Sequence, residues 1–105
     1  MNVLGIETSC DETSAAVVKD GNSLLSCVVS SSLKFHAKYG GIIPEIASRM
    51  QLETIVQVTD SAIKEAGLKL KSIGLVSVTC APGLPGSLLV GISFAKAVSS
   101  SAGLP

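Results

Sequence analysis

The sequence predicts an α/β fold in which a three-stranded antiparallel meander is followed by a helix, a parallel strand and a second helix. Three observations support this prediction. Residues 1–30 hold short apolar runs of strand length around an Asp20-Gly21 pair, a strong hairpin signal. Between residues 44 and 66, apolar residues recur mostly every three or four positions, which is the period of a helix. A Val-rich run and another helix-like segment then flank a Pro-Gly turn.

The meander accounts for the start of the chain. Residues 3–8 form the first predicted strand, and a polar turn over residues 9–12 leads into the second strand, residues 13–18. The Asp20-Gly21 hairpin then leads into the third strand, residues 23–30.

The second half supplies the helices and the last strand. After a polar loop over residues 31–41, Pro44 suits the first position of a helix that Ala66-Gly67 ends. Residues 73–80 predict a strand, and residues 86–101 predict the second helix. The apolar stripe of the first helix consists of Ile46, Ala47, Met50, Ile55, Ala62, Ile63 and Ala66.

This order of elements is the opening of a ribonuclease-H-like layer, in which a right-handed crossover brings the fourth strand parallel to the first. A fifth strand and a third helix would complete the layer, so we expect an incomplete lobe. The strand over residues 73–80 would then keep an unpaired edge. We therefore expect the chain to associate with itself through that edge or through the second helix.

Composition limits the classes of function. With 8 basic and 8 acidic residues, the chain lacks the electrostatic footprint of a protein that binds nucleic acid unaided. Hydrophobic residues make up 47% of the chain, which excludes a disordered protein. Three cysteines match neither a zinc ribbon nor a disulfide framework, so we expect a cytoplasmic protein. Prolines and glycines interrupt the uncharged run over residues 72–95, so we expect no membrane-spanning helix.

The first turn suited to chemistry joins the first two predicted strands. It holds the carboxylates of Glu7, Asp11 and Glu12 and the hydroxyls of Thr8 and Ser9. Backbone amides in such a turn can form an anion nest, and hydroxyls add donors for a phosphate. Because carboxylates repel a bare phosphate, they suit a metal-bridged phosphate, an oriented water or a proton transfer. A polar β-turn with Asx-type hydrogen bonds is the alternative.

The second such turn, residues 80–87, joins the last predicted strand to the second helix. It lacks the Gly-Lys-Ser/Thr ending of a P-loop, but amides at a helix N-terminus suit a phosphate or carboxylate. The alternative is a tight connection with Ser87 near the helix cap. Farther along the helix, small residues recur every four positions and would let another helix, in this chain or another, approach closely; they are Ser87, Gly91, Ala95 and Ser99.

Three motifs closely resemble the TsaD family, also called the Gcp or O-sialoglycoprotein endopeptidase family. They are GIETSCDET at residues 5–13, HAKYGGIIPEIASR at residues 36–49 and PGLPGSLLVG at residues 82–91. The resemblance implies an actin-like ATPase fold, with two ribonuclease-H-like lobes around a nucleotide cleft, of which residues 1–105 would be the N-terminal lobe. It also implies a transferase that moves threonylcarbamoyl from threonylcarbamoyl-AMP to the adenosine following the anticodon of tRNA.

The resemblance also implies roles for residues of both turns. Asp11 and Glu12 would be the catalytic acidic pair. The residues facing the phosphate or nucleotide, which is threonylcarbamoyl-AMP or ATP, would be Thr8, Ser9, Cys10, Pro82, Gly83, Gly86 and Ser87. The sequence departs from the family at Ala81, where Gly is usual, and at Gln51, where His is frequent.

Metal and partners follow from the same resemblance. The family holds a divalent metal, iron or zinc, with residues that this chain does not contain, and His36 alone cannot make that site. We therefore expect the chain by itself to be inactive. Implied partners are a TsaB-like paralogue, other threonylcarbamoyladenosine-synthesis proteins and, through the full-length enzyme, tRNA. The expected partner interface is Leu88, Gly91, Ala95 and Ser99. The alternatives are a non-catalytic interaction module and a lobe of another ATP-dependent protein of the actin-like fold.

Overall fold

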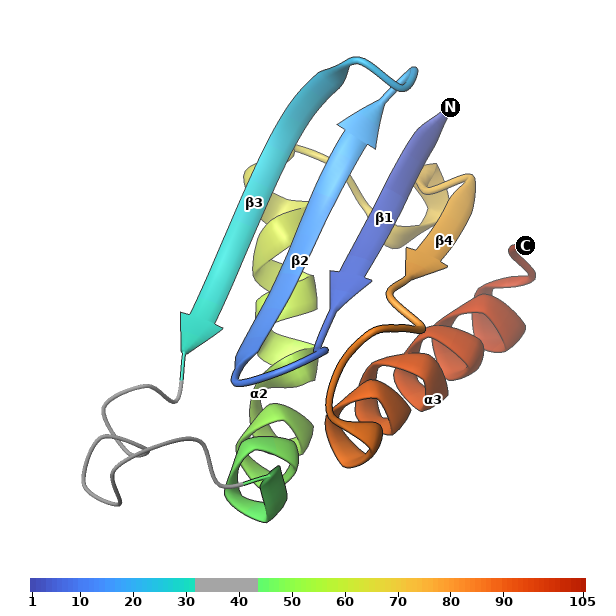
Figure 1. Ribbon diagram of the computed structural model, residues 1–105. Helices are drawn as coiled ribbons and strands as arrows, with labels where there is room; N and C mark the ends of the chain where they lie inside the picture. Colours follow the sequence, from blue (N-terminus) through green and yellow to red (C-terminus); the bar gives the residue numbers. More distant parts are fainter. Residues whose placement is uncertain (32–43) are drawn as a thin grey trace.

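The computed structural model describes residues 1–31 and 44–105, in which one sheet is covered on one face by two long helices (Figure 1). The elements are β1 (Asn2–Glu7), β2 (Glu12–Lys19), β3 (Ser23–Ser31), α2 (Pro44–Glu65), the short 3-10 turn η1 (Leu70–Ser72), β4 (Leu75–Val78) and α3 (Pro85–Ala102). The last strand is shorter than the predicted residues 73–80. Ile73 instead ends the 3-10 turn and is buried in the core.

The sheet has the strand order β3-β2-β1-β4. β1 pairs antiparallel with β2, β2 pairs antiparallel with β3, and β4 lies parallel to β1. Asp20 and Gly21 both have positive φ, at 54° and 73°, which is the backbone of a two-residue hairpin turn. The predicted meander, the parallel fourth strand and the α/β class are therefore confirmed.

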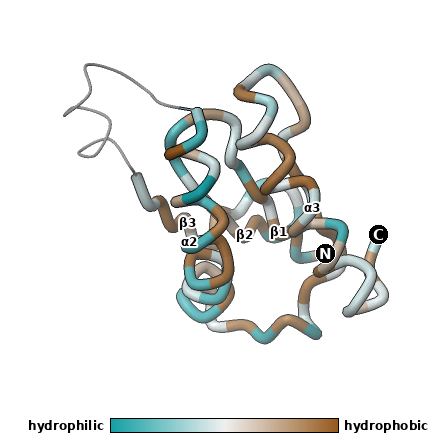
Figure 2. The backbone as a smooth tube through the Cα atoms, turned by 90° about the horizontal axis from the view of Figure 1, so that it is seen from below, coloured by the Kyte–Doolittle hydropathy of each residue, from teal (hydrophilic) through white to brown (hydrophobic). Residues whose placement is uncertain are grey.

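The core lies between the sheet and the helices. Along β2 the buried residues alternate as Thr13, Ala15 and Val17, because successive side chains of a strand point to opposite faces. α2 buries the face that includes Ile55 and Ala62 against the sheet. Hydrophobic stretches recur along both helices between hydrophilic ones (Figure 2). Neither helix combines the length and the apolar character required to span a bilayer.

The chain ends beside the edge of β4. Gly103 adopts the left-handed conformation at φ 68° and stops α3, and the amide of Leu104 donates to Ser99 O. The Pro105 carbonyl then accepts a hydrogen bond of 3.1 Å from the amide of Val76. One edge amide of β4 is thus already paired within the chain. The expected self-association through this edge stays a prediction.

Candidate functional site

The β1–β2 loop and the β4–α3 turn lie in direct contact below the ends of β1 and β4. The amide of Leu84 donates to Ser9 O across 2.7 Å. Gly83 lies so close to the loop that a Cβ atom built on it would fall 2.7 Å from Ser9 Cβ. The structure therefore brings together the two turns that the sequence singled out, although more than 70 residues separate them.

Thr8 lies inside this junction rather than on its surface. Its side chain is fully buried, and Thr8 Oγ1 donates to Ser87 O across 2.6 Å while it accepts from the amide of Gly91. Both partners belong to α3, so the hydroxyl joins the loop to that helix. The hydroxyl is thus buried and bonded within the chain, and the expected contact of Thr8 with a phosphate stays a prediction.

The hydroxyl of Ser87 is likewise bonded inside this junction. Its side chain is fully buried, and its hydroxyl donates to Cys10 O across 3.1 Å. Ser87 does not cap the helix either, since the N-cap residue of α3 is Leu84 and no side chain caps it. In this arrangement the hydroxyl holds the loop, and the expected contact of Ser87 with a nucleotide stays a prediction.

Gln51 is a site residue whose role the sequence did not reveal. It lies on the buried face of α2 with 1% of its surface exposed. Its side-chain Nε2 donates to three carbonyls of the β1–β2 loop: Thr8 O at 3.2 Å, Cys10 O at 3.1 Å and Glu12 O at 2.8 Å. In the sequence, Gln51 was marked only because it stands where the resembled family frequently has His.

Glu7 holds the loop from the other side. One carboxylate oxygen accepts from the amide of Ser9, and the other accepts from the hydroxyl of Thr79, which follows β4. Burial raises the pKa of the Glu7 carboxyl, but the hydrogen bonds from Ser9 and Thr79 outweigh it and leave the pKa below its ordinary value. Glu7 therefore stays ionised as the loop's anchor and is not suited to accept a proton near neutral pH.

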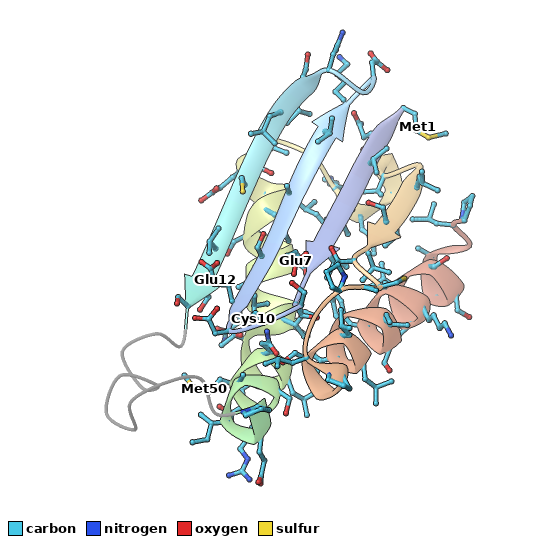
Figure 3. The ribbon with its side chains drawn as sticks, in the orientation of Figure 1. Met1, Glu7, Cys10, Glu12 and Met50 are labelled. Atoms are coloured by element: carbon cyan, nitrogen blue, oxygen red, sulfur yellow. The ribbon has the colours of Figure 1, made fainter. Side chains whose placement is uncertain are left out.

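The two candidate catalytic carboxylates lie at the outer end of the loop. Glu12 is the first residue of β2 and is exposed, while Asp11 before it is half-buried. Figure 3 shows Glu7, Cys10 and Glu12 around the lower ends of β1 and β2, with Met50 of α2 below them. Asp11 lines a small hollow together with Ser31 of β3 and Thr54 of α2.

The remaining nucleotide-facing candidates are accessible. Ser9 and Cys10 are half-buried, while Pro82, Gly83 and Gly86 are exposed. A Cβ atom on Gly86 would come within 3.6 Å of Ser48 Cβ on α2, which is ordinary contact. These residues thus form the open rim of the junction between the β1–β2 loop and the N-terminus of α3.

The expected partner stripe on α3 is partly buried within the chain. Gly91 and Ala95 are buried in the chain itself, Gly91 beneath Thr8 and Val78 of the sheet. These two residues therefore bring α3 close to its own sheet, and their expected contact with a partner stays a prediction. Leu88 and Ser99 are half-buried. A large apolar side chain that α3 does expose is that of Leu89, with 63% of its surface exposed.

In the described ranges, no three His, Cys, Asp or Glu residues gather closely enough to hold a metal ion. Glu7, Asp11 and Glu12 thus do not form a metal site in this arrangement. His36, Lys34 and Lys38 lie outside the described residues.

Comparison with known proteins identifies the relatives of this fold and loop arrangement. The family model of TsaD, tRNA N6-adenosine threonylcarbamoyltransferase, matches residues 23–105. The chain belongs to the TsaD family. Curated members of the TsaD family align with all or nearly all of it, and the chain spans 31% of the length of the first of them.

Three of these relatives carry the name tRNA N6-adenosine threonylcarbamoyltransferase. The protein of Caldicellulosiruptor saccharolyticus is 55% identical over 105 residues, and that of Thermodesulfovibrio yellowstonii is 56% identical over 105 residues. That of Geobacillus kaustophilus is 53% identical over 103 residues, which cover 98% of this chain and 30% of the relative. The resemblance to TsaD drawn from the three motifs is confirmed.

Among solved structures, YeaZ from Pseudomonas aeruginosa matches with a TM-score of 0.71 at 16% sequence identity. The match covers 99% of this chain and 41% of YeaZ. At this identity the likeness concerns the fold only, and it confirms the ribonuclease-H-like, actin-like architecture for this TsaD-family chain.

Proposed function

We propose that the chain is the N-terminal lobe of a tRNA threonylcarbamoyltransferase and supplies one wall of its nucleotide cleft. The observation that carries the proposal is the family match over residues 23–105, joined to relatives of that name at about 55% identity. In the proposed reaction, the N6 amine of adenosine attacks the threonylcarbamoyl carbonyl carbon. The bond from that carbon to the phosphate oxygen breaks, AMP leaves, and the amine gives up a proton.

We assign the proton-accepting role to Asp11 or Glu12. Both are carboxylates at the outer end of the β1–β2 loop, where Asp11 lies beside β3 and α2, and Glu12 is exposed. A positioned general base of this kind contributes about 10²–10⁴-fold to a rate. Glu7 is a poor candidate because its two oxygens are engaged by Ser9 and Thr79.

We assign the phosphate of the acyl adenylate to the rim formed by Ser9, Cys10 and the first turn of α3. The first amides of a helix lack partners within the helix, and the dipole there favours an anion. Gly83 and Gly86 leave this rim without side chains, so a phosphate can approach the backbone closely. No step of the proposal uses a metal, because the described residues do not fit one.

The test joins this chain to the remainder of the Caldicellulosiruptor saccharolyticus relative, in place of the segment that it matches. Transfer of labelled threonine to tRNA is measured for the chimera and its Asp11→Asn and Glu12→Gln variants. We expect the chimera to be active, at least one variant to lose about 10²-fold or more in kcat/KM, and the 105-residue chain by itself to show no turnover. Asp20→Asn, at the opposite end of the sheet, is the matched control. Variants that both stay within about twofold of the chimera would remove the proton-acceptor assignment.

A second role, docking of a TsaB-like paralogue, is favoured by an apolar groove between α2 and α3. Leu52, Val56 and Leu89 line it and expose 67%, 62% and 63% of their surfaces, respectively. Phe94 forms part of its floor. Exposed apolar residues gathered in one groove are typical of an interaction surface. Gel filtration of the chain mixed with a TsaB-like protein tests this role, and separate elution of the two proteins would contradict it.

A further inference from the structure

We propose that Gln51 is a positioning residue, which fixes the direction in which the backbone amides of the β1–β2 loop point. This inference rests on the proposed function only for its expected effect on activity, since the Ser9 amide already donates to the Glu7 carboxylate. The structural part of it stands on the contacts of Gln51 itself. Those contacts join α2 to three peptide groups of the loop.

The orientation of the Gln51 amide follows from its surroundings. Three carbonyl oxygens, those of Thr8, Cys10 and Glu12, face one end of the side chain. The NH₂ end faces these acceptors, because the carbonyl end would repel them. Since the group has two hydrogens for three oxygens, one hydrogen is shared between two carbonyls. At the other end of the amide, Oε1 is buried and has no hydrogen-bond partner among the described residues. Retaining an unpaired buried acceptor is costly, so the three contacts to the loop must outweigh that cost.

Because a trans peptide group is planar, holding its carbonyl toward α2 turns its amide hydrogen away from that helix. The carbonyl and the amide hydrogen of one peptide group point in opposite directions. Because Gln51 draws the carbonyls of Thr8 and Cys10 toward α2, the amides of Ser9 and Asp11 point away from that helix. The amide of Ser9 does so visibly, since it donates to the Glu7 carboxylate on the helix-free side of the sheet.

The other contacts of the loop reinforce this orientation. Ser87 Oγ of α3 donates to Cys10 O, which it shares with Gln51, and the amide of Leu84, the N-cap residue of α3, donates to Ser9 O. Removing Gln51 leaves Cys10 O with its Ser87 partner but takes away the side-chain donor to Thr8 O and Glu12 O. The loop then loses the hydrogen bonds by which Gln51 joins it to α2.

Gln51→Met tests the proposal, because methionine has a similar length and no donor or acceptor comparable to an amide. The matched control is Thr59→Val, farther along the same helix, since Thr59 Oγ1 is also buried and has no hydrogen-bond partner within residues 1–31 and 44–105. The first readout is hydrogen exchange of the 105-residue chain, followed by NMR. We expect the Ser9 amide to exchange about tenfold faster in Gln51→Met, and within about twofold of wild type in Thr59→Val.

The exchange rate of the side-chain NH₂ protons of Gln51 gives a second test within the wild-type chain. They are expected to exchange at least about tenfold more slowly than those of Gln57, which is exposed on the same helix. Gln51→His keeps a ring N–H donor, so the Ser9 amide is expected to regain part of its protection from hydrogen exchange. This variant replaces Gln51→Met in the test if Gln51→Met unfolds. Equal exchange for Gln51 and Gln57, or an unchanged Ser9 amide in Gln51→Met, would overturn the proposal.

The second readout uses the chimera described above. There Gln51→Met is expected to lower kcat about tenfold with a smaller change in KM, while Thr59→Val changes neither by more than about twofold. An equal loss in both variants would assign the effect to the fold rather than to the loop. An inactive wild-type chimera would count against the proposed function only, because the exchange measurements decide the role of Gln51 independently.

Discussion

Gly91 N donates a hydrogen bond of 3.1 Å to Thr8 Oγ1, and that hydroxyl fills the space that a side chain on Gly91 would need. The contact brings α3 directly against the end of β1. It couples the position of the helix to that of the β1–β2 loop, because Thr8 begins the loop and also donates to Ser87 O. The stability of this junction is therefore open to direct test.

Gly91→Ala is expected to lower the free energy of unfolding by about 1–3 kcal/mol, the usual cost of overpacking a tight interior site. The added Cβ atom would meet Thr8 Oγ1 and Val78 Cγ2. Urea unfolding measures the change. Gly86→Ala on the same helix is the control, since its Cβ atom would meet Ser48 at an ordinary 3.6 Å. If both variants lose the same free energy, helix effects rather than the Thr8 contact would explain the loss.

Removal of the Thr8 hydroxyl tests the same contact between the β1–β2 loop and α3 from the side of the loop. Thr8→Val keeps the shape of the side chain but leaves the Gly91 amide and one acceptor site of Ser87 O without their partner. We expect a loss of about 1–3 kcal/mol in the free energy of unfolding, the cost of buried unsatisfied polar groups. Thr54→Val is the comparison, because Thr54 is only half-buried. A loss no larger than that of Thr54→Val would mean that the hydroxyl contributes little.

Glu7 predicts a dependence of stability on pH. Its pKa in the folded chain lies below the ordinary 4.5, so ionised Glu7 stabilises the fold above that pH, and this contribution disappears as the pH falls through the lower folded value. Wild type should therefore be more stable than Glu7→Gln at pH 7, and the difference should shrink below about pH 4.5. Unfolding curves between pH 7 and pH 3 measure it. A difference that stays constant over this range would contradict the role of the carboxylate.

The groove between α2 and α3 predicts a change in association. Val56→Lys combined with Leu89→Lys places charges on two side chains that are more than half exposed, so the fold should lose at most about 0.5 kcal/mol. We expect the double variant to be less self-associated than wild type in light scattering and to lose binding of a TsaB-like protein. Leu24→Lys, at an exposed position of β3, is the control. If that control lowers association as much, the sheet rather than the groove would be the contact surface.

Much of the fold was predictable from local pattern. The Asp20-Gly21 turn, the alternation along β2 and the three-to-four residue period of α2 depend on residues near each other in sequence, so each is visible without tertiary structure. The motifs likewise indicated the family and the importance of both turns. The end of β4 was placed less well, because Thr79 leaves the strand to bond with Glu7 of β1.

The sequence by itself determined the order of the elements, the family, and the two turns that form the candidate site. Only the tertiary structure decided which polar groups of those turns face inward. From the sequence, Thr8 and Ser87 were predicted to contact a ligand, but in the structure their hydroxyls hold the loop to α3. Gln51, noted only because it stands where His is frequent in the family, holds the loop to α2. The physical reason is that a buried hydroxyl or amide bonds to whichever group the fold brings beside it, and these partners lie 39 to 79 positions away along the chain.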